Sequence, residues 1–134
     1  MPRTLRLLLV EDSENDTLLL LNHLQRYGYT VDWSRVDTAA ALLAALEGGP
    51  WDVVLSDDAL PQFNGLEALA MVRAKVPELP FILVSGTIDE SVAATAKEAG
   101  VDDYVMKANL EELVPVIERL TQATRERRAN ARGI

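Results

Sequence analysis

The sequence predicts one α/β domain, built as a doubly wound, five-stranded parallel sheet with helices on both faces. Short apolar runs alternate along the chain with longer amphipathic segments, which is the order expected of parallel strands joined by crossover helices. The runs are apolar at consecutive positions, as strands covered on both faces are. The length of 134 residues suits a single domain.

The first strand and helix are marked by clear end signals. The apolar run Leu5–Val10 predicts a strand, and the helix after it should extend to Tyr27 and end at Gly28. Ser13 is placed to cap this helix with its side-chain oxygen, and Asp16 lies three residues on as its reciprocal capping partner.

The next unit repeats this order. Thr30–Val36 is rich in β-forming residues and predicts the second strand. Asp37 or Thr38 then caps a helix over Ala39–Glu47, and the two glycines and the proline at positions 48–50 stop it.

The second half of the chain predicts three more strands, at Val53–Asp57, Phe81–Val84 and Asp103–Met106. Asn64 and Asp89 are placed to cap the two helices between these strands.

The last helix should cover about Leu110 to Arg128 and contains Pro115. Because proline lacks an N–H and its ring clashes with the preceding turn, either the first turn is distorted or the regular helix begins near Val114. We expect the main domain to cover residues 1–124 and a basic helical extension to cover 125–134. The helix has an apolar seam, which would allow it to pair in a homodimer or to lead to an attached domain. The seam consists of Leu113, Val114, Ile117, Leu120 and Thr124.

Composition excludes several classes of protein. The chain has no cysteine, which excludes disulfides and thiolate metal sites. Its net charge of -8 argues against nucleic-acid binding by this domain. No apolar stretch reaches the length of a membrane span, and the N-terminus leads straight into a strand, unlike a signal peptide. We therefore expect a cytoplasmic domain without membrane contact.

Chemically useful side chains follow four of the five predicted strands. Glu11 and Asp12 follow the first strand, Asp57 ends the third, Ser85 follows the fourth, and Lys107 follows the fifth. Because ligand sites in such sheets lie beyond the carboxyl ends of the strands, these groups should gather at one edge. Three acids suit a divalent cation, and a hydroxyl and an ammonium beside them suit a phosphoryl group.

Each of these residues also has a simpler interpretation when it is taken alone. Glu11 and Asp12 could open a helix, because acids favour helix N-termini. Asp57 could be a turn residue and Lys107 a solvated surface lysine. Only their joint placement at strand ends favours a site.

Five motifs, in this order and spacing, resemble the receiver domain of response regulators, the CheY-like module of two-component signalling, from about Leu5 to Leu120. The motifs are Leu-Leu-Leu-Val-Glu11-Asp12, Trp51 to Pro61, Asn64 to Glu67, Pro80 to Gly86 and Asp103 to Lys107. The resemblance implies a flavodoxin-like strand order of 2-1-3-4-5. The pattern Ser-Asp-x-x-Leu-Pro-x-Phe-x-Gly at residues 56–65, with Val-Ser-Gly at 84–86, also looks like a branch found in multidomain sensor kinases.

The resemblance implies that Asp57 accepts a phosphoryl group from the phosphohistidine of a histidine kinase or from a phosphotransfer protein. It implies that Mg²⁺, or Mn²⁺ in its place, is held by Glu11, Asp12, Asp57 and the backbone carbonyl of Ala59. By the same resemblance, Lys107 and Ser85 bind the phosphoryl oxygens. The backbone N–H groups of Asp58 and Gly86 complete this cradle.

The resemblance also implies a switch. Ser85 moves toward the phosphoryl group, Tyr104 rotates inward, and the face of the fourth helix, fifth strand and fifth helix changes shape. That face would then act on a partner, an attached sensor or effector domain, or a second copy of the chain. Ala108 stands where the family usually has proline, so a cis peptide bond is not expected there.

Two other functions stay open. A phosphohydrolase of the haloacid-dehalogenase type also uses a strand-end aspartate with Mg²⁺, but it needs an acid two residues on, where this chain has Ala59. A receiver-like module that binds partners without phosphorylation is the other alternative. A flavodoxin-like nucleotide site is disfavoured, because the loop after the first strand is acidic where a phosphate would need a glycine-rich cradle.

Overall fold

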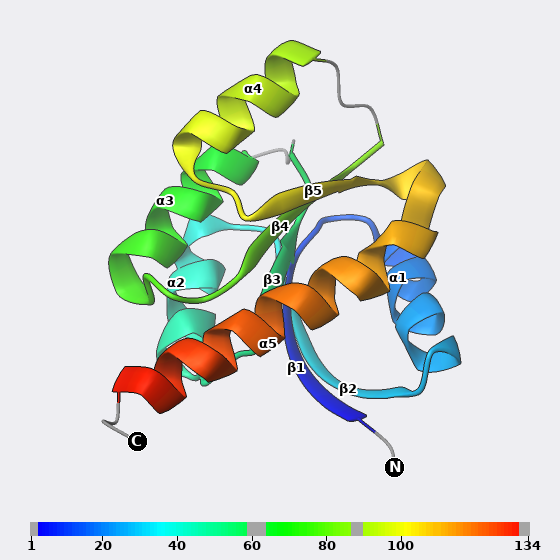
Figure 1. Cartoon of the computed structure of the whole chain (residues 1–134). Helices are drawn as coiled ribbons and strands as arrows, with labels where there is room; N and C mark the ends of the chain where they lie inside the picture. The colour runs from blue at the N-terminus through cyan, green and yellow to red at the C-terminus, as the bar shows by residue number, and fades with distance from the viewer. Residues whose placement is uncertain (1–2, 59–63, 87–89, 132–134) are drawn as a thin grey trace.

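The computed structural model describes residues 3–58, 64–86 and 90–131, and five parallel strands lie within these ranges. The strands are β1 Arg3–Val10, β2 Tyr29–Val36, β3 Val53–Ser56, β4 Phe81–Ser85 and β5 Asp103–Met106. They form one sheet in the order β2-β1-β3-β4-β5 (Figure 1). The predicted fold class and the strand order implied by the resemblance are confirmed.

The four helices that connect these strands lie where the sequence predicts them, and a fifth helix follows β5. They are α1 Glu14–Arg26, α2 Ala39–Glu47, α3 Gly65–Lys75, α4 Glu90–Ala99 and α5 Leu113–Ala131, with a 3₁₀ helix, η1, at Lys107–Glu112. Three caps are confirmed: Ser13, Thr38 and Asn64 each accept a backbone N–H with a side-chain oxygen. Thr38, rather than Asp37, is the cap of α2. The predicted cap Asp89 lies outside the described residues.

The last helix differs from its predicted bounds. The segment after β5 first forms η1, in which Asn109 has non-helical backbone angles, and regular helix begins only at Leu113. Pro115 therefore lies in the first turn of α5, where backbone N–H groups have no acceptor within the helix. A proline is tolerated there, which settles the choice that the sequence left open in favour of a start near Val114.

The sheet divides the core into two layers. Leu8, Val54 and Phe81 pack with α2 and α3 on one face. Leu7 and Leu9 pack with α1 and α5 on the other face (Figure 1). The central strands are therefore buried on both faces, which explains their uninterrupted apolar sequence. Within the described ranges, no helix combines the length and the apolar character needed to cross a membrane.

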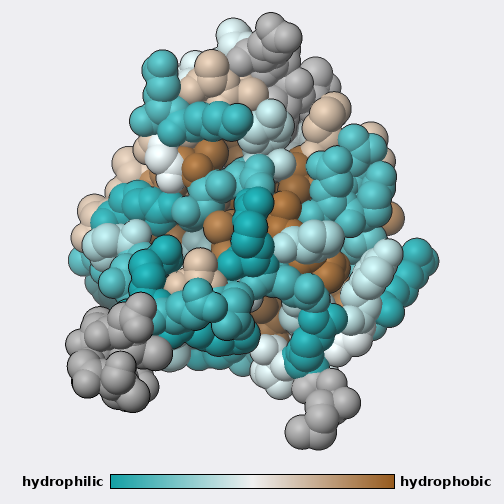
Figure 2. Space-filling view, in the orientation of Figure 1, coloured by the Kyte–Doolittle hydropathy of each residue, from teal (hydrophilic) through white to brown (hydrophobic). Residues whose placement is uncertain are grey.

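The apolar seam of α5 belongs to this core. Leu113 and Ile117 are fully buried, and Thr124 is buried with its hydroxyl donating to the carbonyl of Leu120. The expectation that this seam is free to pair in a homodimer is therefore wrong, because its residues already cover the domain's own sheet. A homodimer through this helix would have to use its outer face, which is mostly hydrophilic (Figure 2).

This burial makes a prediction for stability. Ile117→Ala should lower the free energy of unfolding by about 2–5 kcal/mol, because it leaves a cavity under α5. Gln122→Ala, on the exposed side of the same helix, should change it by less than about 0.5 kcal/mol. Urea titration measures both values. Equal effects of the two substitutions would contradict the buried position of the seam.

Candidate functional site

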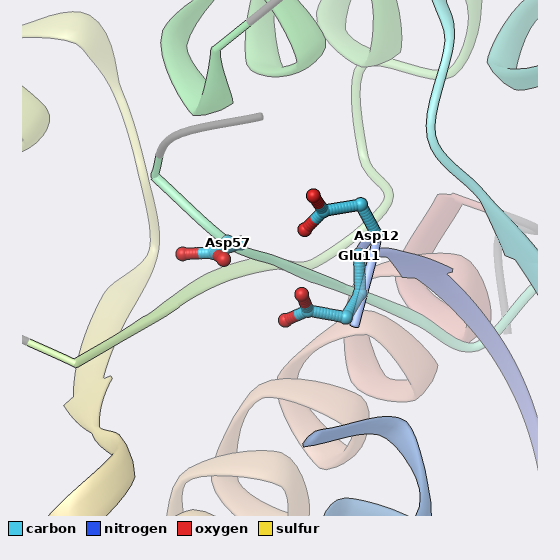
Figure 3. Close-up of side chains that lie close together, drawn as sticks. All are labelled: Glu11, Asp12 and Asp57. Carbon is cyan, nitrogen blue, oxygen red and sulfur yellow. The ribbon is translucent and has the colours of Figure 1, made fainter. Parts of the chain in front are cut away.

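Three carboxylates gather at the carboxyl ends of β1 and β3. Glu11, Asp12 and Asp57 each place a carboxylate oxygen within 4.8 Å of the others. Figure 3 shows the side chains of Glu11 and Asp12 turned toward that of Asp57. Strand register is the cause: Val10 pairs with Ser56, so the residues that follow these strands leave the sheet side by side. This edge also lies where the strand order reverses.

Burial sets the electrostatics of this cluster. Glu11 is only 2% exposed, Asp12 is exposed, and Asp57 is half-buried. Burial raises the pKa of Glu11, and the negative charge of Asp57 raises it further. Burial also raises the pKa of Asp57, with a further contribution from the Asp58 side chain. The charged form of the cluster is therefore disfavoured unless a cation offsets it.

Lys107 is the cation that the chain itself supplies. It follows β5, and its Nζ lies 3.2 Å from Glu11 Oε2 and 3.3 Å from Asp57 Oδ2. A third ion pair, to Asp16 Oδ2, is shorter at 2.6 Å. Burial alone would lower the pKa of Lys107, but the hydrogen bond to Asp16 and the charges of Glu11 and Asp57 outweigh it and raise the pKa. The ammonium therefore stays charged among the acids.

Asp16 is a site residue that the sequence did not reveal. It was expected to complete a reciprocal cap with Ser13, and only half of that cap forms. The Asp16 N–H donates to Ser13 Oγ at 3.2 Å, but the Ser13 N–H donates to Glu11 Oε1 at 3.0 Å. The Asp16 carboxylate turns instead to Lys107. Its position in the first turn of the helix that follows Glu11 and Asp12 was the available signal, and the capping pattern concealed it.

The other predicted residues that the structure describes lie at the carboxyl ends of β3 and β4. Ser85 is buried at the end of β4, and its partner across the ladder is Met106, the residue before Lys107. The Asp58 N–H donates to Asp57 Oδ1 at 2.8 Å, which fixes one carboxylate oxygen. Gly86 follows β4 and is exposed. Ala59, whose carbonyl was expected to bind metal, lies outside the described residues.

Tyr104 lies on β5, three residues before Lys107. It is half-buried and packs against the core face formed by α2 and α3. The Lys97 ammonium lies 5.7 Å from the centre of its ring. Its ring is therefore neither fully buried nor free in solvent.

Gly65 is a second residue whose role the sequence does not show, because in the sequence it is only one member of the motif that begins at the Asn64 cap. Its N–H donates to Asp58 O at 3.0 Å. A Cβ at this position would lie 2.8 Å from the backbone oxygen of Asp57, which is closer than such atoms approach. The start of α3 therefore packs directly against the backbone that carries Asp57, and only glycine allows that approach.

The fold and the charged groups at its switch point define a class of protein: an α/β domain with an oxygen-rich acidic cluster served by one lysine. A model of the response regulator receiver domain matches residues 7–118. The chain therefore belongs to the receiver domain family of two-component response regulators, as its motifs indicated.

Relatives and solved structures agree with this assignment. The chain is 33% identical over 120 residues to the transcriptional regulatory protein TcrA of Mycobacterium tuberculosis, covering 87% of this chain and 46% of that protein. It is 40% identical over 102 residues to the uncharacterized transcriptional regulatory protein YvcP of Bacillus subtilis, covering 76% of this chain and 42% of that protein. The chain thus spans less than half the length of these relatives.

Two solved receiver domains show the same fold. The receiver domain of the sensor histidine kinase PA1611 from Pseudomonas aeruginosa matches with a TM-score of 0.75 and 24% identity, over 89% of this chain and 98% of that one. That structure has a magnesium ion coordinated in its active site cleft. The signal receiver domain of an HD domain-containing protein from Pseudomonas fluorescens matches with a TM-score of 0.79 and 27% identity, over 96% and 95% of the two chains.

The raised pKa values predict a pH dependence. An acid whose pKa is raised by folding adds stability below its ordinary pKa, and that stability is lost as pH rises. Asp57→Asn should therefore be more stable than the metal-free wild type at neutral pH, and its advantage should shrink as pH falls toward 4. Lys107 keeps Asp16 and Glu11 as partners in this variant.

Urea titrations across this pH range, in the absence of metal, measure the difference between the two proteins. Glu78→Gln removes an exposed acid in the turn before β4, at the opposite edge of the sheet, and is the control; it should show little pH-dependent gain because solvent screens its charge. A wild type that is more stable than Asp57→Asn at neutral pH would contradict the electrostatic cost of the cluster.

The close approach of Gly65 predicts a second effect. Gly65→Ala should destabilise the domain by about 1–3 kcal/mol and displace the backbone of Asp57, because the carbonyl opposite cannot move aside as a side chain would. Gly48→Ala is the matched control, since its Cβ would meet only ordinary contacts at 3.5 Å or more. Urea titration and the amide NMR signals of Asp57 and Asp58 report the two effects. An unchanged Asp57 signal in Gly65→Ala would contradict the proposed packing.

Proposed function

We propose that this domain is a phosphoacceptor switch of a two-component phosphorelay. Asp57 takes a phosphoryl group from the phosphohistidine of a histidine kinase or phosphotransfer protein in a Mg²⁺-dependent reaction. The observation that carries this proposal is the meeting of the half-buried Asp57 carboxylate with Glu11, Asp12 and the Lys107 ammonium at one edge of the sheet. Family membership supports it, since receiver domains act in two-component signalling.

The donor set fits a hard divalent cation. Glu11, Asp12 and Asp57 supply the carboxylate oxygens that Mg²⁺ prefers, and Mn²⁺ accepts the same ligands. The magnesium ion in the PA1611 receiver domain supports this assignment by analogy. By the family resemblance, the backbone carbonyl of Ala59 would join them. A bound cation would neutralise the charge that gathers on the acids and on the incoming phosphoryl oxygens.

The chain's own residues then perform the transfer. A carboxylate oxygen of Asp57 attacks phosphorus, an O–P bond forms, and the P–N bond to the donor imidazole breaks, which leaves the imidazole to regain a proton. Lys107 pairs with the phosphoryl oxygens, and the Ser85 hydroxyl donates to them. The N–H groups of Asp58 and Gly86 donate to the remaining oxygen. Because the transition state is loose, this positioning and charge neutralisation account for most of the catalysis.

The signal would leave through the face formed by α4, β5 and α5. A phosphoryl group on Asp57 attracts the Ser85 hydroxyl, and Tyr104 moves into the space that Ser85 leaves. Tyr104 supports this role because it is half-buried beside α4, with Lys97 near its ring. Phosphorylation would thus shift the population between two states of this face. An attached domain is the expected recipient, since the relatives are more than twice as long as the matched region.

The test is phosphorylation by acetyl phosphate with Mg²⁺, followed by mass measurement. Wild type should gain the mass of one phosphoryl group, and both Asp57→Asn and wild type with excess EDTA should gain none. Glu78→Gln, which removes an exposed carboxylate in the turn before β4, at the opposite edge of the sheet, should be labelled like wild type.

The same assay separates the alternatives. An unlabelled wild type that still binds its partner would contradict the proposal and favour a phosphorylation-independent binding module. Repeated turnover of a phosphate ester would instead favour a phosphohydrolase. Labelling that persists in Asp57→Asn would place the acceptor elsewhere.

A further inference from the structure

Lys107 binds most closely to an acid outside the carboxylate cluster. Its Nζ donates a 2.6 Å hydrogen bond to Asp16 Oδ2 and longer ones, of 3.2 and 3.3 Å, to Glu11 Oε2 and Asp57 Oδ2. We propose that Asp16 is a positioning residue that draws the Lys107 ammonium toward α1 and so leaves the oxygens of Glu11 and Asp57 available to a divalent cation. This inference rests on the proposed function, because it concerns the metal site of that same reaction.

The argument begins with competition between cations. An ammonium and a divalent cation both seek carboxylate oxygens, and at this site they would share those of Glu11 and Asp57. Without Asp16, these two acids would be the ion-pair partners left to Lys107, so the ammonium would settle between them. A bound metal would then have to displace it. Asp16 offers the ammonium a partner that is not one of the three clustered ligands.

The structure holds Asp16 in place for this role. Its backbone N–H donates to Ser13 Oγ in the first turn of α1, and the Ser13 N–H donates to Glu11 Oε1. Ser13 therefore connects the backbone of Asp16 and the carboxylate of Glu11 through two hydrogen bonds. Thr17 also donates its hydroxyl to the Ser13 carbonyl at 2.9 Å, which fixes the same turn. Asp16 is thus positioned by the backbone that leads out of β1.

The surroundings strengthen the Asp16–Lys107 pair. A small cavity is lined by both side chains together with Leu19, Leu20 and Leu110. The side chains of Lys107 and Asp16 are only 23% and 32% exposed. Partial burial beside apolar side chains lowers the local dielectric, so this pair is screened less than a surface pair.

The experiment measures Mg²⁺ affinity by calorimetry in wild type, Asp16→Asn and Glu14→Gln. Glu14 lies in the same first turn of α1, is exposed, and has no ion pair in the part of the chain described. We expect Asp16→Asn to weaken Mg²⁺ binding by about three- to tenfold, as contacting charged residues couple. Glu14→Gln should weaken it by less than about twofold, because a surface charge is screened. Equal affinities of Asp16→Asn and wild type would overturn the inference.

A second pair of variants shows whether Asp16 acts through Lys107. In a Lys107→Met background the competing ammonium is absent, so adding Asp16→Asn should weaken Mg²⁺ binding no more than Glu14→Gln does. A loss as large as that in the wild-type background would overturn the inference, since Asp16 would then act on the metal directly or through the fold.

A measurement without metal separates this inference from the proposed function. Ammonium protons held by a carboxylate exchange slowly with water, so the NMR signal of Lys107 Nζ should be visible and unshifted in Glu14→Gln relative to wild type. In Asp16→Asn it should shift, because the ammonium then pairs with Glu11 and Asp57 alone. If the signal is unchanged in Asp16→Asn, the positioning role fails even where Mg²⁺ binds. If wild type binds no Mg²⁺, the proposed function fails, and the Lys107 signal alone then decides whether Asp16 holds the ammonium.

Discussion

The site depends on one electrostatic balance, between partly buried acids and the ammonium of Lys107. Burial raises the pKa values of Glu11 and Asp57, and the charge of Asp57 raises that of Glu11 further. A single lysine offsets part of that cost and reaches three acids at once. The remaining excess of negative charge is what gives such a cluster affinity for a divalent cation.

The sheet makes this balance possible because it holds the acids where they would not remain by themselves. β1 and β3 are buried on both faces, and their ladder sets Val10 beside Ser56. Moving either strand by one residue would exchange the side chains that face the two helical layers, so close packing on both faces specifies the register. The geometry of the acids therefore follows from apolar packing several residues away, and the hydrophobic core supplies the free energy that keeps like charges together.

The parts of this structure that could be predicted are those that local sequence determines. Apolar runs located the strands, and Ser13, Thr38 and Asn64 marked helix starts because capping is a local hydrogen bond. The gathering of Glu11, Asp57 and Lys107 followed from the rule for parallel sheets. The Asp16–Lys107 pair could not be predicted, because it depends on where η1 carries the lysine after β5. The orientation of the α5 seam was missed for a similar reason: periodicity reveals an apolar stripe but not the surface that it covers.

The position of Asp16 suggests why a lysine is suitable at this place. A lysine is a compact charge on a flexible stem with three donors, so it can exchange one carboxylate for another without moving the backbone. In the proposed cycle the site is first metal-free, then bound to a cation, and then phosphorylated on Asp57. Lys107 needs a different set of ion-pair partners in each of these states. The Asp16 carboxylate on α1, outside the cluster, is the partner of the Lys107 ammonium in the first two states. Ser13 donates to the Glu11 carboxylate and accepts from the Asp16 N–H. Hydrogen bonds therefore connect the acids of the site to the first turn of α1.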